Sequence, residues 1–372
     1  MPTREVLIDE SRTLGEQPET GHNRWHPDIP PVVGCDPGDE VVLQTRDAFD
    51  GQMGPDATLE TVGAPDLNVV HPLTGPVAVA GAQPGDLLEV EILEVAPDGY
   101  AYTVQVPGFG FLREAFPEPY IARWALADGW ATSEELPGVR VPGHAFMGTI
   151  GVAPSHELMA ACAAREQAAL DRGGFVLPPL ADGAVPAAEA IAHEALRTIP
   201  PRENAGNVDI KQLGRGARLF IPVQVPGALF SAGDAHFAQG DSETCGTAIE
   251  MRSTLHVRFR VHPGAASAKG IRDLQFARDD WFVAPEFAGP RRFHATTGIS
   301  VTREGENRPE DLTLAARNAL LNMIDHLMEH GGWSRQQAYA ICSVAVDLKV
   351  SQVVDVPNFV VSAFLPLDIF TS

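Results

Sequence analysis

Residues 84–95 alternate apolar and polar side chains with a period of two, and this pattern most constrains the fold. Leu88, Val90 and Ile92 are separated by Glu89 and Glu91. This is the period of a β-strand with one buried face. Similar apolar stretches predict further strands at residues 40–45, 219–225, 255–261, 350–356 and 360–365. The chain is therefore expected to be rich in β-structure.

Two regions carry helical signals instead. Ser155 is an expected N-cap for an Ala-rich stretch that ends at two glycines near residue 173. Near the C-terminus, apolar residues recur at i, i+4, i+7 and i+8 from Leu320, which predicts a helix ending at a second glycine pair. Ser334 and Gln337 then form the pattern of a capping box, so another helix is expected to follow.

Strands dominate this pattern, and strands and helices do not alternate regularly. The sequence therefore predicts an α+β fold, mainly β, with a β-sandwich-like core and helical additions in the middle and near the C-terminus. We expect one compact unit with an N-terminal β-rich part (1–154), a helical insertion (155–200) and a β core carrying the site plus C-terminal helices (201–372). The first 35 residues are polar and rich in proline. They are expected to wrap over a surface or reach a neighbouring subunit.

Composition limits the function. With 27 basic and 49 acidic residues, the net charge is −22, which argues against nucleic acid and anionic membranes as partners. We identify no signal peptide and no apolar run long enough to span a membrane. The four cysteines lie far apart, without a Cys-x-x-Cys pair. This suits buried free thiols in a reducing cytoplasm.

Residues 233–243 (Gly-Asp-Ala-His-Phe-Ala-Gln-Gly-Asp-Ser-Glu) gather three acids, one imidazole and one amide. Divalent metals prefer such oxygen and nitrogen ligands. Asp234 and His236 are two residues apart, so they would face the same side of a strand. Asn207 and Asp209 precede a predicted strand and could meet them at one end of a sheet. A solvated acidic hairpin would show the same spacing, so the residues alone leave both interpretations open.

Other catalytic machinery has less support. The chain has no Gly-x-Ser-x-Gly elbow, and none of its three lysines lies in the Gly/Ser-rich setting of a Ser-Ser-Lys amidase. Cys245 could lie near a site, but no obvious neighbour would lower the pKa of its thiol. Residues 108–110, Gly-Phe-Gly, are too short and apolar to cradle phosphates. A turn, or a lid beside an apolar pocket, is the expected role of this segment.

Ordered matches over most of the chain resemble the acetamidase/formamidase family. They begin in the run Gly-Asn-Val-Asp-Ile-Lys-Gln-Leu at 206–213. Further matches fall at residues 71–76, 81–86, 148–154, 222–250, 338–339, 347–348, 352–355 and 365–366. The resemblance implies hydrolysis of small aliphatic amides to a carboxylate and ammonia. It also implies a mainly β fold with a helical C-terminal part, a homo-oligomer and metal dependence.

On this basis we expect a metal-activated water acting on a small neutral amide. Zinc is the expected metal, and calcium and manganese are the alternatives. The expected metal ligands are Asp209, Asp234, His236 and Glu243, with Asp47 as a further member. Glu243 or Asp241 is expected to be the general base. Asn207 and Gln239 are expected to hydrogen-bond the amide or its oxyanion, and the residues expected to contact substrate are His71, His144 and Phe109.

The chain departs from the family pattern in two places. Ala205 replaces the first glycine of the usual Gly-Gly-Asn, and Val208 stands where formamidases often carry cysteine. The second difference favours an acetamidase-like substrate. Two alternatives remain open. One is hydrolysis of another linear C–N bond, in a urea-like, guanidino or larger amide substrate, and the other is a non-catalytic metal-binding homologue.

Overall fold

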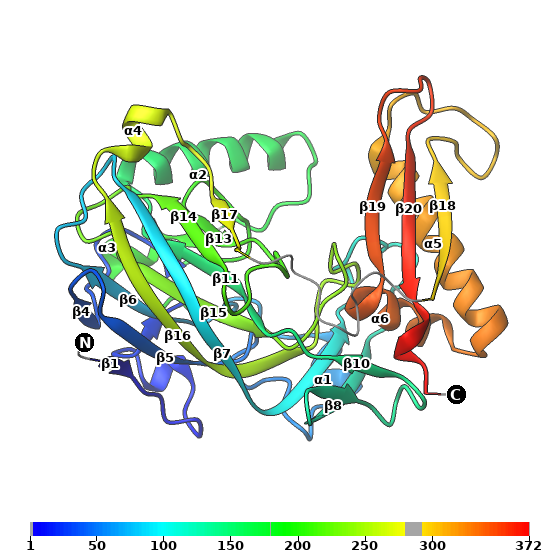
Figure 1. Ribbon diagram of the computed structural model, residues 1–372, viewed down its shortest axis with the longest axis horizontal. Helices are drawn as coiled ribbons and strands as arrows, with labels where there is room; N and C mark the ends of the chain where they lie inside the picture. The colour runs from blue at the N-terminus through cyan, green and yellow to red at the C-terminus, as the bar shows by residue number, and fades with distance from the viewer. Residues whose placement is uncertain (1–2, 179, 280–291, 372) are drawn as a thin grey trace.

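The computed structural model describes residues 3–178, 180–279 and 292–371. Within these ranges, fifteen strands join in one large sheet, and two smaller sheets have three and two strands. Figure 1 shows a strand-rich body beside a smaller C-terminal lobe of strands and helices. The predicted α+β class, mainly β, is confirmed. The division into 1–154, 155–200 and 201–372 stays a prediction, although strands from the first and third ranges share the large sheet.

Two long antiparallel strands, β7 (Leu87–Gln105) and β16 (Glu250–His262), run through the body (Figure 1). They contain the predicted alternating stretches. Val90 pairs with Phe259 and Ile92 with Val257, and all four side chains are buried. Glu89 is buried as well, contrary to simple alternation, and it contacts His262 at 2.6 Å. The paired imidazole offsets the cost of burying this carboxylate.

The large sheet continues on both sides of this pair. From β7 it extends through β8 (Tyr120–Ala127), β9 (Trp130–Thr132) and β10 (Arg140–Pro142). From β16 it extends through β15 (Phe230–His236), β11 (Phe146–Val152) and β13 (Ala205–Asn207). Additional strands branch from this path: β5 (Glu40–Thr45), β6 (Leu73–Val79), β14 (Arg218–Pro222) and β17 (Gln275–Ala277).

The N-terminal segment joins the sheet, which differs from the expected surface wrapping. β1 (Thr3–Val6) pairs with β5, while β2 (Gly21–His22) and β4 (Val33–Cys35) pair with β6. Between them, β3 (Arg24–Trp25) pairs with β12 (Leu196–Arg197). The side chain of Trp25 is 1% exposed. Burial of this ring supplies apolar contacts that the polar composition did not suggest.

The predicted helices are confirmed. α2 (His156–Asp171) is capped by Ser155, and α5 (Leu312–Gly331) ends at Gly332 in a left-handed conformation. α6 (Arg335–Ala345) has the predicted capping box of Ser334 and Gln337. Three short helices, α1 (Leu59–Gly63), α3 (Glu189–Ala192) and α4 (Ala265–Lys269), lie between strands, as does the 3₁₀ turn η1 (Leu14–Glu16). In the described ranges, no helix combines the length and apolarity that crossing a membrane requires.

The C-terminal lobe is a three-stranded sheet with helix α5 packed against it. Its central strand is β20 (Val360–Pro366), flanked by β18 (Phe293–Ile299) and β19 (Asp347–Gln352). A short 3₁₀ turn, η2 (Leu367–Ile369), follows. α6 contacts α5, β20 and the long β7, so it connects the lobe to the body. The site described next lies in the body, on the β11, β13 and β15 side.

Candidate active site

Neighbouring strands bring several acids together around one histidine. β15 carries Asp234 and His236, Asp209 follows β13, and Glu250 opens β16. β11 pairs with both β13 and β15, and His236 lies directly opposite Glu250 in the β15–β16 ladder. Glu243 comes from the loop after β15. Sheet pairing therefore gathers residues that are up to 41 positions apart in the sequence.

His236 is the centre of this inner cluster, which we define as Asp209, Asp234, His236, Glu243 and Glu250. Its Nε2 atom is 3.3 Å from Glu250 Oε2 and 3.4 Å from Asp234 Oδ1. Glu243 Oε1 is 3.9 Å from the same nitrogen. Ligand atoms of Asp209, His236 and Glu243 also lie within 4.8 Å of one another. Four carboxylates thus surround one imidazole that is 1% exposed.

Gln239 fixes the orientation of this imidazole. Its Nε2 donates to the backbone carbonyl of Asp209 at 2.9 Å, so its Oε1 must accept from His236 Nδ1, also at 2.9 Å. His236 therefore carries a proton on Nδ1. The Nε2 lone pair of the neutral ring then faces the carboxylates, which is the arrangement of a metal-ligating histidine.

Polar residues of the neighbouring strands hold Asp234. The Thr149 hydroxyl lies 3.0 Å from Asp234 Oδ2 and 2.9 Å from Asn207 Oδ1, and it can donate to either. Asn207 Nδ2 donates to the Ile199 carbonyl at 3.0 Å. His71 Nε2 is 3.9 Å from Asp234 Oδ2. The sequence-predicted residues Asn207 and His71 thus border the inner cluster.

The backbone around the cluster is strained and tightly fitted. Asp209, Asp234 and Glu243 all have positive φ, at 46°, 58° and 43°. Non-glycine residues adopt this conformation rarely, and such strain concentrates at functional sites. A Cβ on Gly148 would lie 2.7 Å from Asp209 Oδ1 and 2.8 Å from Asp234 Oδ2. Only glycine leaves room for both carboxylates here.

Burial and mutual repulsion shift the ionisation of the cluster. Burial raises the pKa of Asp209 to about 7. Burial, together with the neighbouring Asp209 carboxylate, raises the pKa of Glu243 well above its ordinary value, and burial also raises the pKa of Glu250. Burial alone would lower the pKa of His236, but the carboxylates of Glu250 and Asp234 hold it well above its ordinary range. The carboxylates of the inner cluster therefore carry more negative charge than the single imidazolium of His236 can balance.

The chemistry of these groups fits a bound cation. His236 Nε2 and Glu250 Oε2 are buried, and neither has a hydrogen-bond partner in the described part of the chain. Buried polar atoms are rarely left unsatisfied in folded proteins. Two overlapping residue groups of the inner cluster, both including His236, have the composition and spacing to hold a metal ion. Imidazole nitrogen with carboxylate oxygen is a ligand set that zinc accepts.

A pocket with an apolar wall opens onto the cluster. Its volume, counted together with its open mouth, is about 590 Å³. Its apolar wall comprises Ala48, Phe49, Leu67, Val70, Val104, Val106, Phe109 and Ile199. Its polar end comprises His71, Asn207, Asp209, Asp234, Glu243, Thr247 and Glu250. Phe109, the predicted lid residue, lies in this wall.

Cys245 also lines the pocket, but its thiol is not activated. Its Sγ atom lies 3.6 Å from the backbone carbonyls of Val104 and Thr247. Burial raises the pKa of the Cys245 thiol above its ordinary value. A nucleophilic cysteine needs the opposite shift.

The structure places Asp47 outside the inner cluster. Its carboxylate accepts hydrogen bonds from the Tyr102 hydroxyl at 2.7 Å and from the backbone N–H groups of Phe49 and Gly51. It belongs to none of the metal-compatible groups found among the described residues. Asp47 therefore supports the turn that carries Phe49 into the pocket wall.

Asp241 and His144 also lie apart from the cluster. The Asp241 carboxylate is 3.6 Å from Lys211 Nζ and 3.8 Å from Lys349 Nζ, and its side chain is 29% exposed. His144 donates its backbone N–H to the Phe237 carbonyl and is not among the described residues that line the pocket. The expectation for Asp241 assumed that nearness in sequence to Glu243 brings both side chains to one site. Asp241 instead turns towards lysines, so of the two acids expected to serve as general base only Glu243 lines the described pocket.

Glu250, Thr149 and Gly148 are the site residues that sequence reasoning missed. Glu250 is the first residue of β16, just before the predicted alternating stretch. The sequence signal that could have identified Glu250 is an acid directly before an alternating, half-buried strand. Its position opposite His236 depends on strand register, which the sequence does not specify. The closeness of Gly148 to the carboxylates likewise depends on tertiary packing.

A buried histidine and acids at the end of an apolar pocket are the arrangement of a hydrolytic enzyme, and comparisons with known proteins identify its kind. The model of the Acetamidase/Formamidase family matches residues 7–372. An acetamidase of Mycolicibacterium smegmatis is 39% identical, over 92% of this chain and 89% of the relative. A formamidase of Methylophilus methylotrophus is 36% identical, over 98% and 93%. The solved structure of a gamma lactamase from Delftia acidovorans is 36% identical with a TM-score of 0.93, covering 100% of this chain and 94% of that one.

The chain belongs to the acetamidase/formamidase family. It is an amidohydrolase that acts on linear amides. The predicted family and activity are thereby confirmed.

Proposed function

We propose that the inner cluster hydrolyses small aliphatic amides with an activated water and a bound divalent metal, zinc being the best candidate. The observation that carries this proposal is the buried Nε2 atom of His236. It has no hydrogen-bond partner among the described residues, and three carboxylate oxygens lie within 3.9 Å of it. Manganese and calcium are alternatives because the donor set is rich in oxygen.

The residues that would hold the metal are His236 with Asp209, Asp234 and Glu250. A bound divalent cation polarises the amide carbonyl and lowers the pKa of water. It also offsets the excess negative charge of the cluster, so that these carboxylates can ionise at neutral pH. Gln239 keeps the Nε2 lone pair of His236 directed inwards, which makes it a positioning residue.

Glu243 is the proposed general base. Its side chain borders the pocket and is 15% exposed, so it can reach both water and substrate. As water attacks the carbonyl carbon, Glu243 takes a proton from it and then delivers that proton to the amide nitrogen. The C–N bond breaks, and a carboxylate and ammonia leave. Proton delivery is essential because the unprotonated amide nitrogen is a poor leaving group.

His71 and Asn207 are proposed to orient the substrate. Burial lowers the pKa of His71, so its imidazole is neutral and can donate one hydrogen bond. Asn207 contacts Ile199 and Thr149 with its side chain and also lines the pocket. Both residues lie at the polar end of the pocket, where they can stabilise the oxyanion that forms on the carbonyl.

The apolar wall favours a second candidate substrate, an amide larger than acetamide. Seven large apolar side chains in the wall exceed what formamide or acetamide can cover. The likeness to a gamma lactamase adds a cyclic amide as a specific option. An apolar substituent packed on this wall would gain about 0.8 kcal/mol per buried methylene.

The deciding experiment measures ammonia release from formamide, acetamide and propionamide before and after chelation, with bound metal quantified. We expect activity to disappear with the metal and return when zinc is added. His236→Ala should lose metal and activity together. Unchanged activity after complete metal removal would overturn the metal-dependent mechanism. Opening of a γ-lactam at a higher kcat/KM than acetamide would establish the second candidate.

We also propose a homo-oligomer in a reducing compartment such as the cytoplasm. The C-terminal lobe exposes apolar side chains in and after β19, namely Val350, Val353, Val354 and Val356. Exposed apolar patches of this kind favour association. All four cysteines are buried and unpaired, which suits reducing conditions. Light scattering of the purified protein tests the oligomer, and a monomer at micromolar concentration would contradict it.

A further inference from the structure

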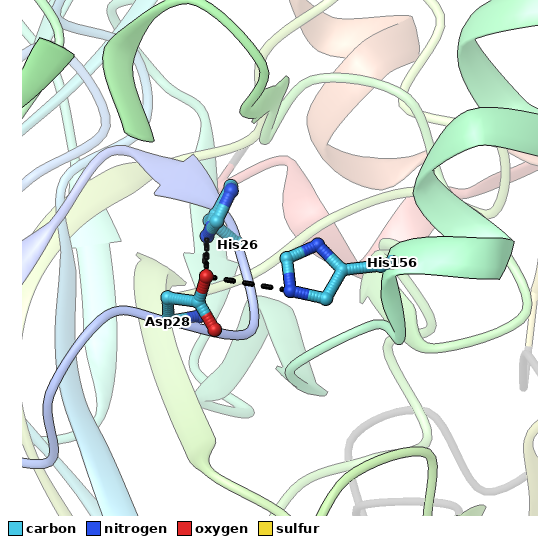
Figure 2. Close-up of side chains that lie close together, drawn as sticks. All are labelled: His26, Asp28 and His156. Carbon is cyan, nitrogen blue, oxygen red and sulfur yellow. Dashed lines mark hydrogen bonds and ion pairs between the residues drawn. The ribbon is translucent and has the colours of Figure 1, made fainter. Parts of the chain in front are cut away.

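A second cluster with metal-binding chemistry lies away from the pocket. We define this outer cluster as His26, Asp28 and His156 (Figure 2). Asp28 Oδ2 is 3.3 Å from His156 Nε2 and 4.0 Å from His26 Nδ1. One ligand atom from each residue lies within 4.8 Å of the others. None of the three is among the described residues that line the pocket.

The fold builds this cluster from two separate segments and places an acid from a third beside it. His26 and Asp28 follow β3, and His156 is the first residue of α2. Because β3 pairs with β12, Glu194 lies just before the partner strand, and its Oε2 is 3.9 Å from His26 Nε2. Figure 2 shows one oxygen of the Asp28 carboxylate joined by dashed lines to both imidazoles. A second acid thus stands on the other side of His26.

Hydrogen bonding identifies the nitrogen of His26 that could bind a cation. The backbone N–H of Asp28 donates to His26 Nδ1 at 3.1 Å, so this nitrogen is unprotonated, and its lone pair is occupied by that N–H until a metal displaces it. His26 is 3% exposed, and its Nε2 atom has no hydrogen-bond partner in the described ranges. Asp28 and His156 are more than half exposed. Solvent can therefore deliver a metal ion and complete its coordination.

We propose that the outer cluster binds one zinc ion, held by His26, Asp28 and His156, with Glu194 adding negative charge nearby. In tetrahedral zinc sites, ligand atoms about 2.0–2.1 Å from the metal lie roughly 3.3 Å apart. The Asp28–His156 distance of 3.3 Å already matches this spacing, and the Asp28–His26 distance of 4.0 Å is longer by less than 1 Å. Two imidazoles favour zinc over calcium or magnesium. The ion would fasten the N-terminal segment to α2.

Two features set a limit on the affinity. The metal must displace the Asp28 N–H from His26 Nδ1, and the positive end of the α2 dipole opposes a cation beside His156. The negative charges of Asp28 and Glu194 act in the other direction. The outer cluster should therefore bind zinc more weakly than the buried inner cluster.

The test is a zinc titration of the full-length protein by calorimetry, starting from protein with its native metal content. We expect one additional zinc per wild-type chain, and loss of that site in His156→Gln and in Asp28→Asn. His193→Gln, which removes an exposed histidine beside Glu194, is the matched control and should retain the site. Zinc should raise the Tm of the wild type and the control but not of His156→Gln. Acetamide hydrolysis should be equal in all four proteins.

A variant of the inner cluster separates zinc binding at the outer cluster from zinc binding at the inner one. In Asp209→Asn, the outer site should still take up one zinc, even though the amidase site is disabled. Cobalt bound there should give the visible absorption of a tetrahedral ion, and His156→Gln should remove it. Equal zinc stoichiometry and affinity in wild type and His156→Gln would overturn the proposal. Absence of any additional zinc in the wild type would also overturn it, whatever the result for amide hydrolysis.

Discussion

The inner and outer clusters both combine histidine with acids, but they differ in how the fold holds them. At the inner cluster, His236 and the carboxylates of Asp234 and Glu250 are at most 4% exposed. At the outer cluster, only His26 is buried, and Asp28 and His156 are 64% and 61% exposed. Buried charges cost far more than exposed ones unless they are paired. A bound cation would therefore offset the cost of burying the inner carboxylates. At the outer cluster, water can solvate the exposed groups without a metal.

Backbone conformation separates the clusters in the same way. Three inner acids have positive φ, while the outer histidine of α2 follows an ordinary Ser155 N-cap. Strain of this kind costs about 1–3 kcal/mol per residue and persists only where the surrounding structure imposes it. The difference indicates that the backbone strain at the inner cluster lowers the free energy of unfolding and, in return, holds the acids in fixed positions. The outer cluster needs no such support, and a bound ion there would act on stability alone.

The largest expected effect is that of Glu243→Gln, which tests whether the inner cluster is chemically special. Removing a general base typically lowers the rate by about 10²–10⁴-fold. We expect such a fall in kcat for acetamide, with bound metal retained, as measured by ammonia release and metal analysis. Asp241→Asn is the matched control from the same segment, because its carboxylate pairs with lysines. Comparable losses in both variants would contradict the role given to Glu243.

Gly148→Ala tests the tight fit of the inner cluster. The added Cβ would lie under 3 Å from Asp209 Oδ1 and Asp234 Oδ2, so these carboxylates must move. Displacement by about 1 Å can cost 10²-fold in rate, and we expect kcat/KM to fall by about that factor. The overpacked variant should also lose about 1–3 kcal/mol of unfolding free energy. Gly34→Ala is the control, since its Cβ would meet only one atom, at 3.8 Å.

Glu243 and Gly148 also illustrate which features of the site could be predicted from the sequence and which could not. Alternation and capping residues predicted the strands and helices because both are local. Asp209, Asp234, His236 and Glu243 were proposed from a polar segment and a family resemblance, and the sheet brings them together. Glu250 and Gly148 act through strand register and close approach, which are properties of the folded chain. Asp241 shares its segment with Glu243, yet lysines from elsewhere in the sequence draw its carboxylate away.

A smaller effect is expected from Gln239→Leu, which removes the partner of His236 Nδ1 and the hydrogen bond to the backbone carbonyl of Asp209. Loss of such an orienting contact typically weakens metal binding by about 10–100-fold. We expect this change in the zinc dissociation constant of the inner cluster, measured by competition with a chelator. Activity at saturating zinc should largely recover, which separates positioning from catalysis. A permanent loss of activity at saturating zinc would assign Gln239 a direct part in the reaction.

The pH dependence of zinc binding gives the finest comparison of the two clusters. Burial raises the pKa of Asp209 to about 7 and also raises those of Glu243 and Glu250. Zinc must displace these protons and the proton of His236, whose pKa the carboxylates of Glu250 and Asp234 raise, so inner-cluster affinity should rise with pH through pH 7. Each displaced proton weakens binding about tenfold per pH unit below that value.

At the outer cluster, burial lowers the pKa of His26, which keeps this imidazole neutral to lower pH. Protonation of His26 should therefore weaken zinc binding less between pH 7 and pH 6 than protonation of the inner carboxylates and His236 does. Calorimetry on Asp28→Asn isolates the inner cluster, and calorimetry on Asp209→Asn isolates the outer one. Parallel pH profiles in the two variants would mean that burial does not distinguish the clusters. A steeper fall of zinc affinity with decreasing pH at the inner cluster would show that the burial of its carboxylates controls the strength of metal binding.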